Sequence, residues 1–293
     1  MQSLEFAGFE PVEVEREGVT VRGVRGGSGP AVLLLHGYPQ TRLIWRLVAG
    51  PLAREFTVVL ADLRGYGESD KPFGEEDHST YSKRAMADDM VELMRSLGHE
   101  RFAVVGHDRG ARVAHRMCLD HPERVERAAV LDIVPTDTMY EATDRGFAQD
   151  TYHWFFLTQP YDLPERLFEG AGDYYVRETI RRWAGRPEMF SQEVMDSYAR
   201  AFADPAAIHA ACEDYRAGIG IDLEHHAADR AARIACPLLV LWGERGALPR
   251  RFDVLKVWRE RAGDVSGHSV DSGHFLPEEA PEETLAALRT FLK

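Results

Sequence analysis

The segment that most constrains the fold lies at residues 102–120. Residues 102–105 form an apolar run typical of a buried strand, and residues 111–120 have helical spacing. Between them stands Gly106-His107-Asp108-Arg109-Gly110, whose glycines permit a tight turn and close strand–helix contact. Strand, sharp turn and helix are the geometry of a nucleophile elbow, with Asp108 where many hydrolases have serine. We therefore expect Asp108 to attack an electrophilic carbon and become an ester.

Strand and helix patterns alternate along most of the chain. Residues 12–25 predict a hairpin, and residues 81–97 and 281–292 predict helices. Further strands are predicted at 31–35, 56–61, 128–134, 237–242 and 266–270. The runs at 31–35 and 56–61 are apolar throughout, as expected of strands covered on both faces. The alternation predicts an α/β fold with a mostly parallel, doubly wound sheet.

Residues 137–233 interrupt this alternation. They are rich in aromatic residues, Arg and Glu, and have helical periodicity without a strong strand. We predict a helical cap inserted after the sixth strand, above the carboxyl ends of the strands, where ligands bind in such sheets. The predicted domains are a core of residues 1–136 and 234–293 and a cap of residues 137–233.

Composition narrows the function. The chain has 293 residues, with 35 Lys and Arg against 48 Asp and Glu, a formal net charge of −13. This excess disfavours nucleic acid as a partner, and an anionic substrate would need a local positive pocket. No signal peptide or membrane-spanning pattern is evident, and three widely spaced cysteines (Cys118, Cys212, Cys236) favour a reducing cytoplasm. His225-His226 lacks a third ligand at a sensible spacing, so we expect no metal.

Four motifs stand in an order that resembles the α/β-hydrolase fold: His36-Gly37-Tyr38-Pro39, Asp62-Leu63-Arg64-Gly65-Tyr66-Gly67, Gly106-His107-Asp108-Arg109-Gly110 and Gly273-His274. Within this fold, four further runs resemble the fluoroacetate (haloacetate) dehalogenases: Asp108-Arg109-Gly110-Ala111-Arg112, Asp132-Ile133-Val134-Pro135-Thr136, His153-Trp154-Phe155-Phe156 and Asp214-Tyr215-Arg216. The resemblance covers nearly the whole chain.

The resemblance implies a role for each matching position. Asp108 would be the nucleophile, Asp132 the orienting acid and His274 the general base. Arg109 and Arg112 would hold the substrate carboxylate, and His153, Trp154 and Tyr215 the leaving halide. It also implies a cofactor-independent enzyme and a homodimer.

The chemistry of these residue types agrees with those roles. The imidazole of His274 has a suitable pKa to deprotonate the water that attacks the ester, and a carboxylate should orient it. Asp132 is our choice for that carboxylate, with Glu244 as the alternative. The backbone N–H groups of Tyr38 and Arg109 are the expected oxyanion hole.

The two arginines point to a carboxylic acid as substrate. Guanidinium groups grip a carboxylate with paired hydrogen bonds, although Arg112 could instead pair with a surface acid. Fluoride is a poor, strongly hydrated leaving group, and His153, Trp154 and Tyr215 could supply three donors. The alternative is that this aromatic run is simply core. Trp183 is a further candidate for the pocket wall.

We therefore predict a hydrolytic dehalogenase that converts fluoroacetate, and chloroacetate, to glycolate and halide. An epoxide hydrolase is the nearest alternative; it would need cap tyrosines to protonate the epoxide oxygen, and the candidates are Tyr152, Tyr174, Tyr175 and Tyr215. The arginine pair has no clear purpose for a neutral epoxide. A non-catalytic ligand-binding protein on the same fold is the alternative from another class.

Overall fold

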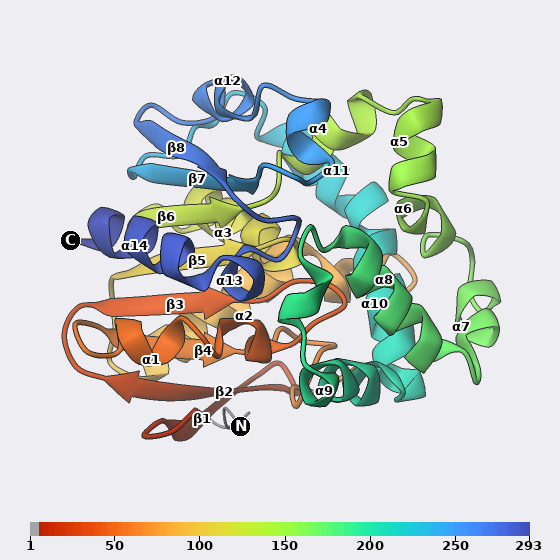
Figure 1. The fold of residues 1–293 in the computed structure, drawn as a ribbon, viewed down its shortest axis with the longest axis horizontal. Helices are drawn as coiled ribbons and strands as arrows, with labels where there is room; N and C mark the ends of the chain where they lie inside the picture. The colour runs from red at the N-terminus through yellow and green to blue at the C-terminus, as the bar shows by residue number, and fades with distance from the viewer. Residues whose placement is uncertain (1–5) are drawn as a thin grey trace.

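The computed structural model describes residues 6–293, and its centre is one eight-stranded sheet (Figure 1). The strand order is β1-β2-β4-β3-β5-β6-β7-β8, in which β1 and β2 pair antiparallel and the strands from β4 to β8 are parallel. The strands are β1 (Glu10–Arg16), β2 (Val19–Gly27), β3 (Ala31–Leu35), β4 (Thr57–Ala61), β5 (Phe102–His107), β6 (Val125–Leu131), β7 (Leu238–Gly243) and β8 (Val265–Val270).

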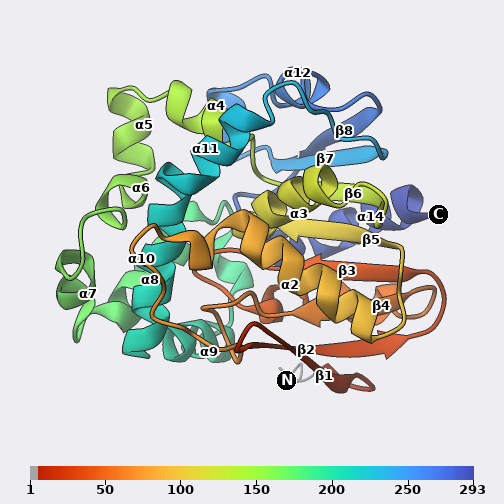
Figure 2. The same cartoon turned by 180° about the vertical axis from the view of Figure 1, so that it is seen from behind.

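Helices cover both faces of the sheet (Figures 1 and 2). On one face α2, α3 and α12 pack over a cluster that includes Met90, Val113 and Trp258. On the other, α1 and α14 pack over a cluster that includes Leu52 and Leu288. Every residue of β4 and β5 is buried, because both faces of these strands are covered. The helices are α1 (Ala49–Leu52), α2 (Lys83–Ser96), α3 (Arg109–Asp120), α4 (Thr136–Glu141), α5 (Arg145–Asp150), α6 (His153–Phe156), α7 (Leu163–Phe168), α8 (Gly172–Trp183), α9 (Gln192–Phe202), α10 (Pro205–Ile219), α11 (Ile221–Ala228), α12 (Val254–Arg259), α13 (Leu276–Glu279) and α14 (Pro281–Leu292).

The predicted α/β fold and its mostly parallel sheet are confirmed. The strand predicted at 31–35 and the helix predicted at 281–292 have those bounds in the structure. The strand predicted at 128–134 instead ends at Leu131, because Asp132 has φ 55° and leaves the extended conformation.

The helices α4 to α11 follow β6 and precede β7, and they lie beyond the carboxyl ends of the parallel strands (Figure 1). This placement brings the insertion over the turns that follow β5, β6 and β8. The first of these helices begins at Thr136 and the last ends at Ala228. The cap limits of 137 and 233 stay a prediction. Among residues 6–293, no helix combines the length and apolarity needed to cross a bilayer.

Candidate active site

Asp108 stands at the turn between β5 and α3 and has a strained backbone, with φ 47° and ψ −115°. The glycines beside it permit this turn. A Cβ on Gly106 would lie 2.4 Å from the carbonyl oxygen of Gly110, and a Cβ on Gly110 would lie 2.4 Å from that of His36. Both distances are shorter than any real contact, so the turn requires glycine at both positions. The elbow therefore projects the Asp108 side chain from the carboxyl edge of the sheet.

One oxygen of the Asp108 carboxylate is held by the backbone. The N–H of Tyr38 donates to Oδ1 at 2.9 Å. The backbone N–H of Arg109, the other expected donor, makes no hydrogen bond within the described chain. Burial alone would raise the pKa of Asp108, but the charges of His274, Arg112 and Arg109 outweigh burial and lower it. Asp108 is therefore ionised near neutral pH, with Oδ2 as the oxygen that Tyr38 does not hold.

His274 and Asp132 lie beside this carboxylate. Nδ1 of His274 is 2.6 Å from Oδ2 of Asp132, whose Oδ1 accepts from the N–H of Gly243 at 2.9 Å. Burial lowers the pKa of His274, but the hydrogen bond and charge of Asp132 outweigh it, so the pKa lies above its ordinary value. Nε2 of His274 is 3.9 Å from Oδ2 of Asp108, too far for a hydrogen bond. The imidazole of His274 therefore flanks the Asp108 carboxylate and keeps Nε2 without a hydrogen-bond partner among the described residues.

The structure also separates the two candidate partners of His274. Glu244 is exposed and does not contact the imidazole by a hydrogen bond, whereas Asp132 does. Gly246, which follows Glu244 in the turn after β7, lies next to Asp132: a Cβ added to Gly246 would be 3.9 Å from each oxygen of the Asp132 carboxylate. Of the two candidates, Asp132, the one favoured from the sequence, is thus the carboxylate hydrogen-bonded to His274.

Arg109 is 1% exposed and is engaged by an acid of the cap. Its Nε and Nη2 donate to the Asp214 carboxylate at 2.9 and 2.5 Å, and Nη2 also donates to the Asp214 carbonyl at 2.7 Å. Its guanidinium lies 4.3 Å from the ring centroid of Tyr215. Nη1 makes no hydrogen bond to residues 6–293. Most of the hydrogen-bonding capacity of Arg109 is therefore already used by Asp214.

Arg112 is 4% exposed and, unlike Arg109, has no acidic hydrogen-bond partner among the described residues. Its Nη1 donates to the carbonyl of Val134 at 3.1 Å and to Oγ1 of Thr136 at 2.9 Å, and Nε is buried without a partner. Burial, and then the charge of Arg109, lower the pKa of Arg112 to about 10. The side chain remains a cation at neutral pH. The alternative of a surface ion pair is wrong, because the side chain is buried and its bonds go to neutral oxygens.

Three aromatic side chains of the cap meet above the elbow. Ring centroids of His153 and Trp154 lie 5.6 and 6.1 Å from that of Tyr215, and Tyr38 lies 5.3 Å from it. Burial lowers the pKa of His153 to about 3, so its imidazole is neutral. Its Nδ1 is buried without a partner, and neither the Trp154 indole nor the Tyr215 hydroxyl bonds to another residue in the part that the structure describes. Such unpaired polar groups are what a bound anion would satisfy.

A cavity of about 380 Å³ connects these parts. Its wall includes Asp108, Asp132 and His274 from the core, Arg112 from α3, and His153, Trp154 and Trp183 from the cap. Trp183 also accepts a hydrogen bond from the backbone N–H of His274 through its carbonyl, at 3.0 Å. Two of the predicted residues, Arg109 and Tyr215, do not line this cavity. The structure therefore brings most of the predicted residues to one space, with Arg112 as the arginine that faces it.

Comparison with known proteins places the chain in a family. Residues 30–281 match the family model of the alpha/beta hydrolase fold. The chain belongs to the alpha/beta hydrolases. This hydrolase is 47% identical to a fluoroacetate dehalogenase of Burkholderia sp. over 98% of its own length and 95% of the relative's. The resemblance predicted from the motifs is thereby confirmed.

The chain is also similar to an epoxide hydrolase and to a hydrolase of known structure. The hydrolase is 34% identical to a soluble epoxide hydrolase of Corynebacterium sp., over 94% of both chains. The crystal structure of ALR0039 from Nostoc sp. superposes with a TM-score of 0.97 at 53% identity and 99% coverage of both chains. These comparisons support a hydrolase and leave its substrate to the site itself.

The hydrolase also has a charged network that our sequence reasoning missed. Asp214 is fully buried and accepts from Arg109, from the Tyr66 hydroxyl at 2.7 Å and from the Lys83 ammonium. Two cations from the core therefore converge on one acid of α10. The run Asp214-Tyr215-Arg216 marked this position only as a resemblance, because nothing in the spacing shows that Lys83 and Arg109 reach it.

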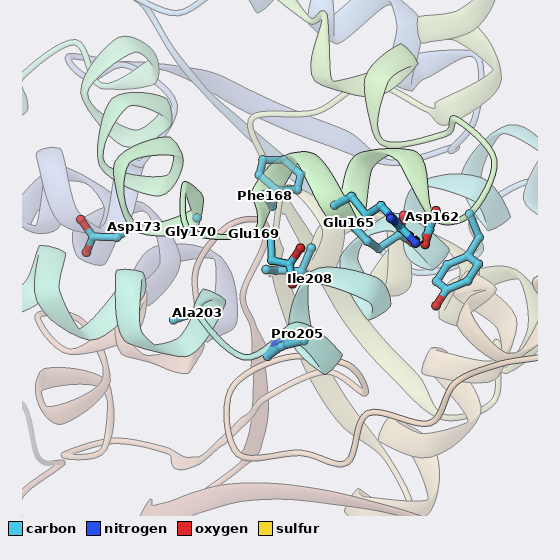
Figure 3. A pocket seen from close by; sticks show the side chains of 12 residues that line it. Asp162, Glu165, Phe168, Glu169, Gly170, Asp173, Ala203, Pro205 and Ile208 are labelled. Carbon is cyan, nitrogen blue, oxygen red and sulfur yellow. Dashed lines mark hydrogen bonds and ion pairs between the residues drawn. The ribbon is translucent and has the colours of Figure 1, made fainter.

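A second hollow, of about 600 Å³, lies on the hydrolase cap between α7, α8 and α10 (Figure 3). Its wall carries the acidic residues Asp162, Glu165, Glu169 and Asp173 with a single arginine, Arg166. None of the predicted site residues lines it. An acidic hollow repels anions, so the smaller cavity at Asp108 is the better site for an anionic substrate.

Proposed function

We propose that this protein is a hydrolytic dehalogenase of small 2-halocarboxylates, with fluoroacetate and chloroacetate as substrates and glycolate and halide as products. One observation carries the proposal: Arg112 is a buried cation without an acidic hydrogen-bond partner, in the same cavity as Asp108. A buried charge is costly unless it is paired, and a substrate carboxylate would supply the missing partner. The 47% identical fluoroacetate dehalogenase supports the same conclusion.

In the first step Arg112 holds the carboxylate and orients the carbon that bears the halogen. Oδ2 of Asp108 attacks that carbon, a C–O bond forms, and the carbon–halogen bond breaks with both electrons leaving on the halide. Oδ2 is the attacking oxygen because Tyr38 already holds Oδ1. The unpaired polar atoms of His153 and Trp154, which line the cavity, are the proposed donors to the departing halide; Tyr215, the third residue predicted for this role, packs behind them.

In the second step water attacks Cγ of the Asp108 ester while Nε2 of His274 takes the proton. The resulting oxyanion forms at Oδ1, where the Tyr38 N–H is already placed. The intermediate collapses by breaking the bond between Cγ and the ester oxygen, and the protonated His274 returns a proton to the glycolate oxygen. Asp132 stabilises the imidazolium during this step.

An epoxide hydrolase is less well supported. Of the four candidate tyrosines, only Tyr152 lines the cavity; Tyr174 is 67% exposed, and Tyr175 and Tyr215 are not in its wall. A neutral epoxide would also leave Arg112 unpaired. A ligand-binding protein without activity would have no need for the backbone strain at Asp108 or for a base placed beside it. The cytoplasmic location and the homodimer stay predictions.

The test is halide release from fluoroacetate and chloroacetate by the wild type and by Asp108→Asn. We expect the variant to lose activity by on the order of 10⁴-fold or more, since the nucleophile is removed. Asp150→Asn is the matched control: Asp150 lines the outer part of the same cavity and should be dispensable. Mass analysis must show that the amide introduced by Asp108→Asn has not hydrolysed back to aspartate. Turnover of styrene oxide with no halide release from either acid would favour the epoxide hydrolase instead.

A further inference from the structure

The mouth of the active-site cavity carries more positive charge than the rest of the molecule would suggest. Three arginines, Arg182, Arg245 and Arg250, line the cavity in addition to Arg112. Arg182 comes from α8 of the cap, whereas Arg245 and Arg250 follow β7 of the core. The chain as a whole has a formal net charge of −13. The arginines therefore form a local positive rim, from both sides of the opening, on an acidic protein.

Neighbouring acids neutralise only part of the positive charge of the three rim arginines. Arg245 forms an ion pair with Asp271 at 2.6 Å. Arg182, whose side chain is 70% exposed, lies 3.5 Å from Glu178, but Arg181 shares the same carboxylate at 3.3 Å. Arg250 is exposed and forms no ion pair within the described residues.

The acidic residue of the rim, Asp150, has a basic neighbour outside the cavity wall. Asp150 lines the cavity, and its carboxylate lies 3.0 Å from Nη2 of Arg251, which is not part of the wall. Arg251 also pairs with Asp144 at 3.1 Å, so it compensates the charge of Asp150 only in part. Arg182 and Arg250 are the positive charges of the rim that an entering molecule meets.

We propose that Arg182 and Arg250 draw small anions into the cavity and so select carboxylates before they reach Arg112. An acidic protein repels an anion at long range, but screening limits that repulsion to about 10 Å in 0.1 M salt. Inside that distance the charges at the opening dominate, and the low-dielectric walls of a cleft concentrate their field. The substrate class rests on the proposed function, whereas the attraction of anions does not.

The experiment compares Arg182→Gln/Arg250→Gln with Arg54→Gln. Arg54 is an exposed arginine without an ion pair among the described residues. It precedes β4 and so lies near the amino ends of the parallel strands, away from the cavity. At low ionic strength we expect the double variant to lose about three- to tenfold in kcat/KM for fluoroacetate, with the loss in KM rather than kcat. Added salt should remove the difference between the double variant and the wild type. Arg54→Gln should match the wild type throughout.

A second variant separates charge from a specific contact. Arg182→Lys/Arg250→Lys keeps both charges and should retain the wild-type kcat/KM and its salt dependence, whereas a direct guanidinium contact with substrate would be lost. A loss in the lysine variant as large as in the glutamine variant would overturn the proposal. So would an equal kcat/KM for the glutamine variant and the wild type at low salt.

Acetate binding distinguishes failure of this inference from failure of the proposed function. Acetate is a carboxylate without a leaving group, and its affinity can be followed by the fluorescence of Trp154 and Trp183, which line the cavity. A weaker, salt-dependent acetate affinity in the glutamine variant supports the rim even if no haloacetate is turned over. If the glutamine variant binds acetate with the wild-type affinity, the proposed role of Arg182 and Arg250 is overturned, even if haloacetates are turned over.

Discussion

The core and the cap contribute to the cavity in different ways. On the core side Asp108, Asp132 and His274 follow strand ends, and backbone N–H groups hold the two carboxylates. On the cap side His153, Trp154 and Tyr215 pack as aromatic rings whose polar atoms lack protein partners in the described chain. The core therefore fixes a hydrolytic geometry that exists without substrate. The cap offers polar atoms that have no partner among the described residues and are free to bind a ligand.

The first prediction isolates the core. His274→Gln should leave the attack by Asp108 possible but stop hydrolysis of the ester, because no base deprotonates water. Steady-state halide release should fall by about 10³-fold or more, while one halide per enzyme is still released in a burst. The measurement is rapid-quench halide analysis with mass analysis of the peptide that contains Asp108. Asp108→Asn/His274→Gln should show no burst; a burst in that variant would place the nucleophile elsewhere.

The second prediction concerns Arg112, the buried cation of α3 that faces the cavity. Arg112→Gln should lower kcat/KM for haloacetates by about 10- to 100-fold, since the charge-assisted bonds to the substrate carboxylate are lost. Arg116→Gln is the matched control, because Arg116 is a buried arginine of the same helix that is paired with Asp120 and Asp229. Steady-state kinetics of both variants provide the comparison. Equal losses in both would show that Arg112 has only a structural role.

The third prediction isolates the cap. Trp154→Phe removes one indole N–H and keeps an aromatic ring, so we expect fluoride release to fall by about 10-fold. Bromide release from bromoacetate should fall less, since bromide is a better leaving group and needs less help. The ratio of the two rates in the same variant serves as the internal control. An equal loss for both halides would assign Trp154 to packing rather than to the leaving group.

The smallest expected effect concerns the pH dependence of kcat. Hydrolysis of the ester needs neutral His274, and the hydrogen bond and charge of Asp132 raise the pKa of His274 above its ordinary value although burial lowers it. The rate should therefore rise with pH as His274 loses its proton, and reach a plateau once the imidazole is neutral. Asp108 adds no acidic limb in this range, since its pKa is lowered. A rate that falls as pH rises from 6 to 8 would contradict this assignment of the base.

The same contrast explains what could be predicted from the sequence. The elbow at Asp108 and the turn at Gly273-His274 are local patterns at strand ends, so the fold and the core residues could be predicted from these patterns together with the family resemblance. The state of Arg109 could not, because its partner Asp214 lies 105 residues away on α10. The rim of Arg182 and Arg250 was missed for the same reason, since cap and core meet only in the folded chain.

The central claim is that Asp108 itself, and not water, displaces the halide. A single turnover of excess enzyme with fluoroacetate in ¹⁸O-labelled water tests it directly. We predict that the glycolate carries unlabelled oxygen from Asp108 and that the label is found in the Asp108 carboxylate. Labelled glycolate together with an unlabelled Asp108 peptide would contradict the account.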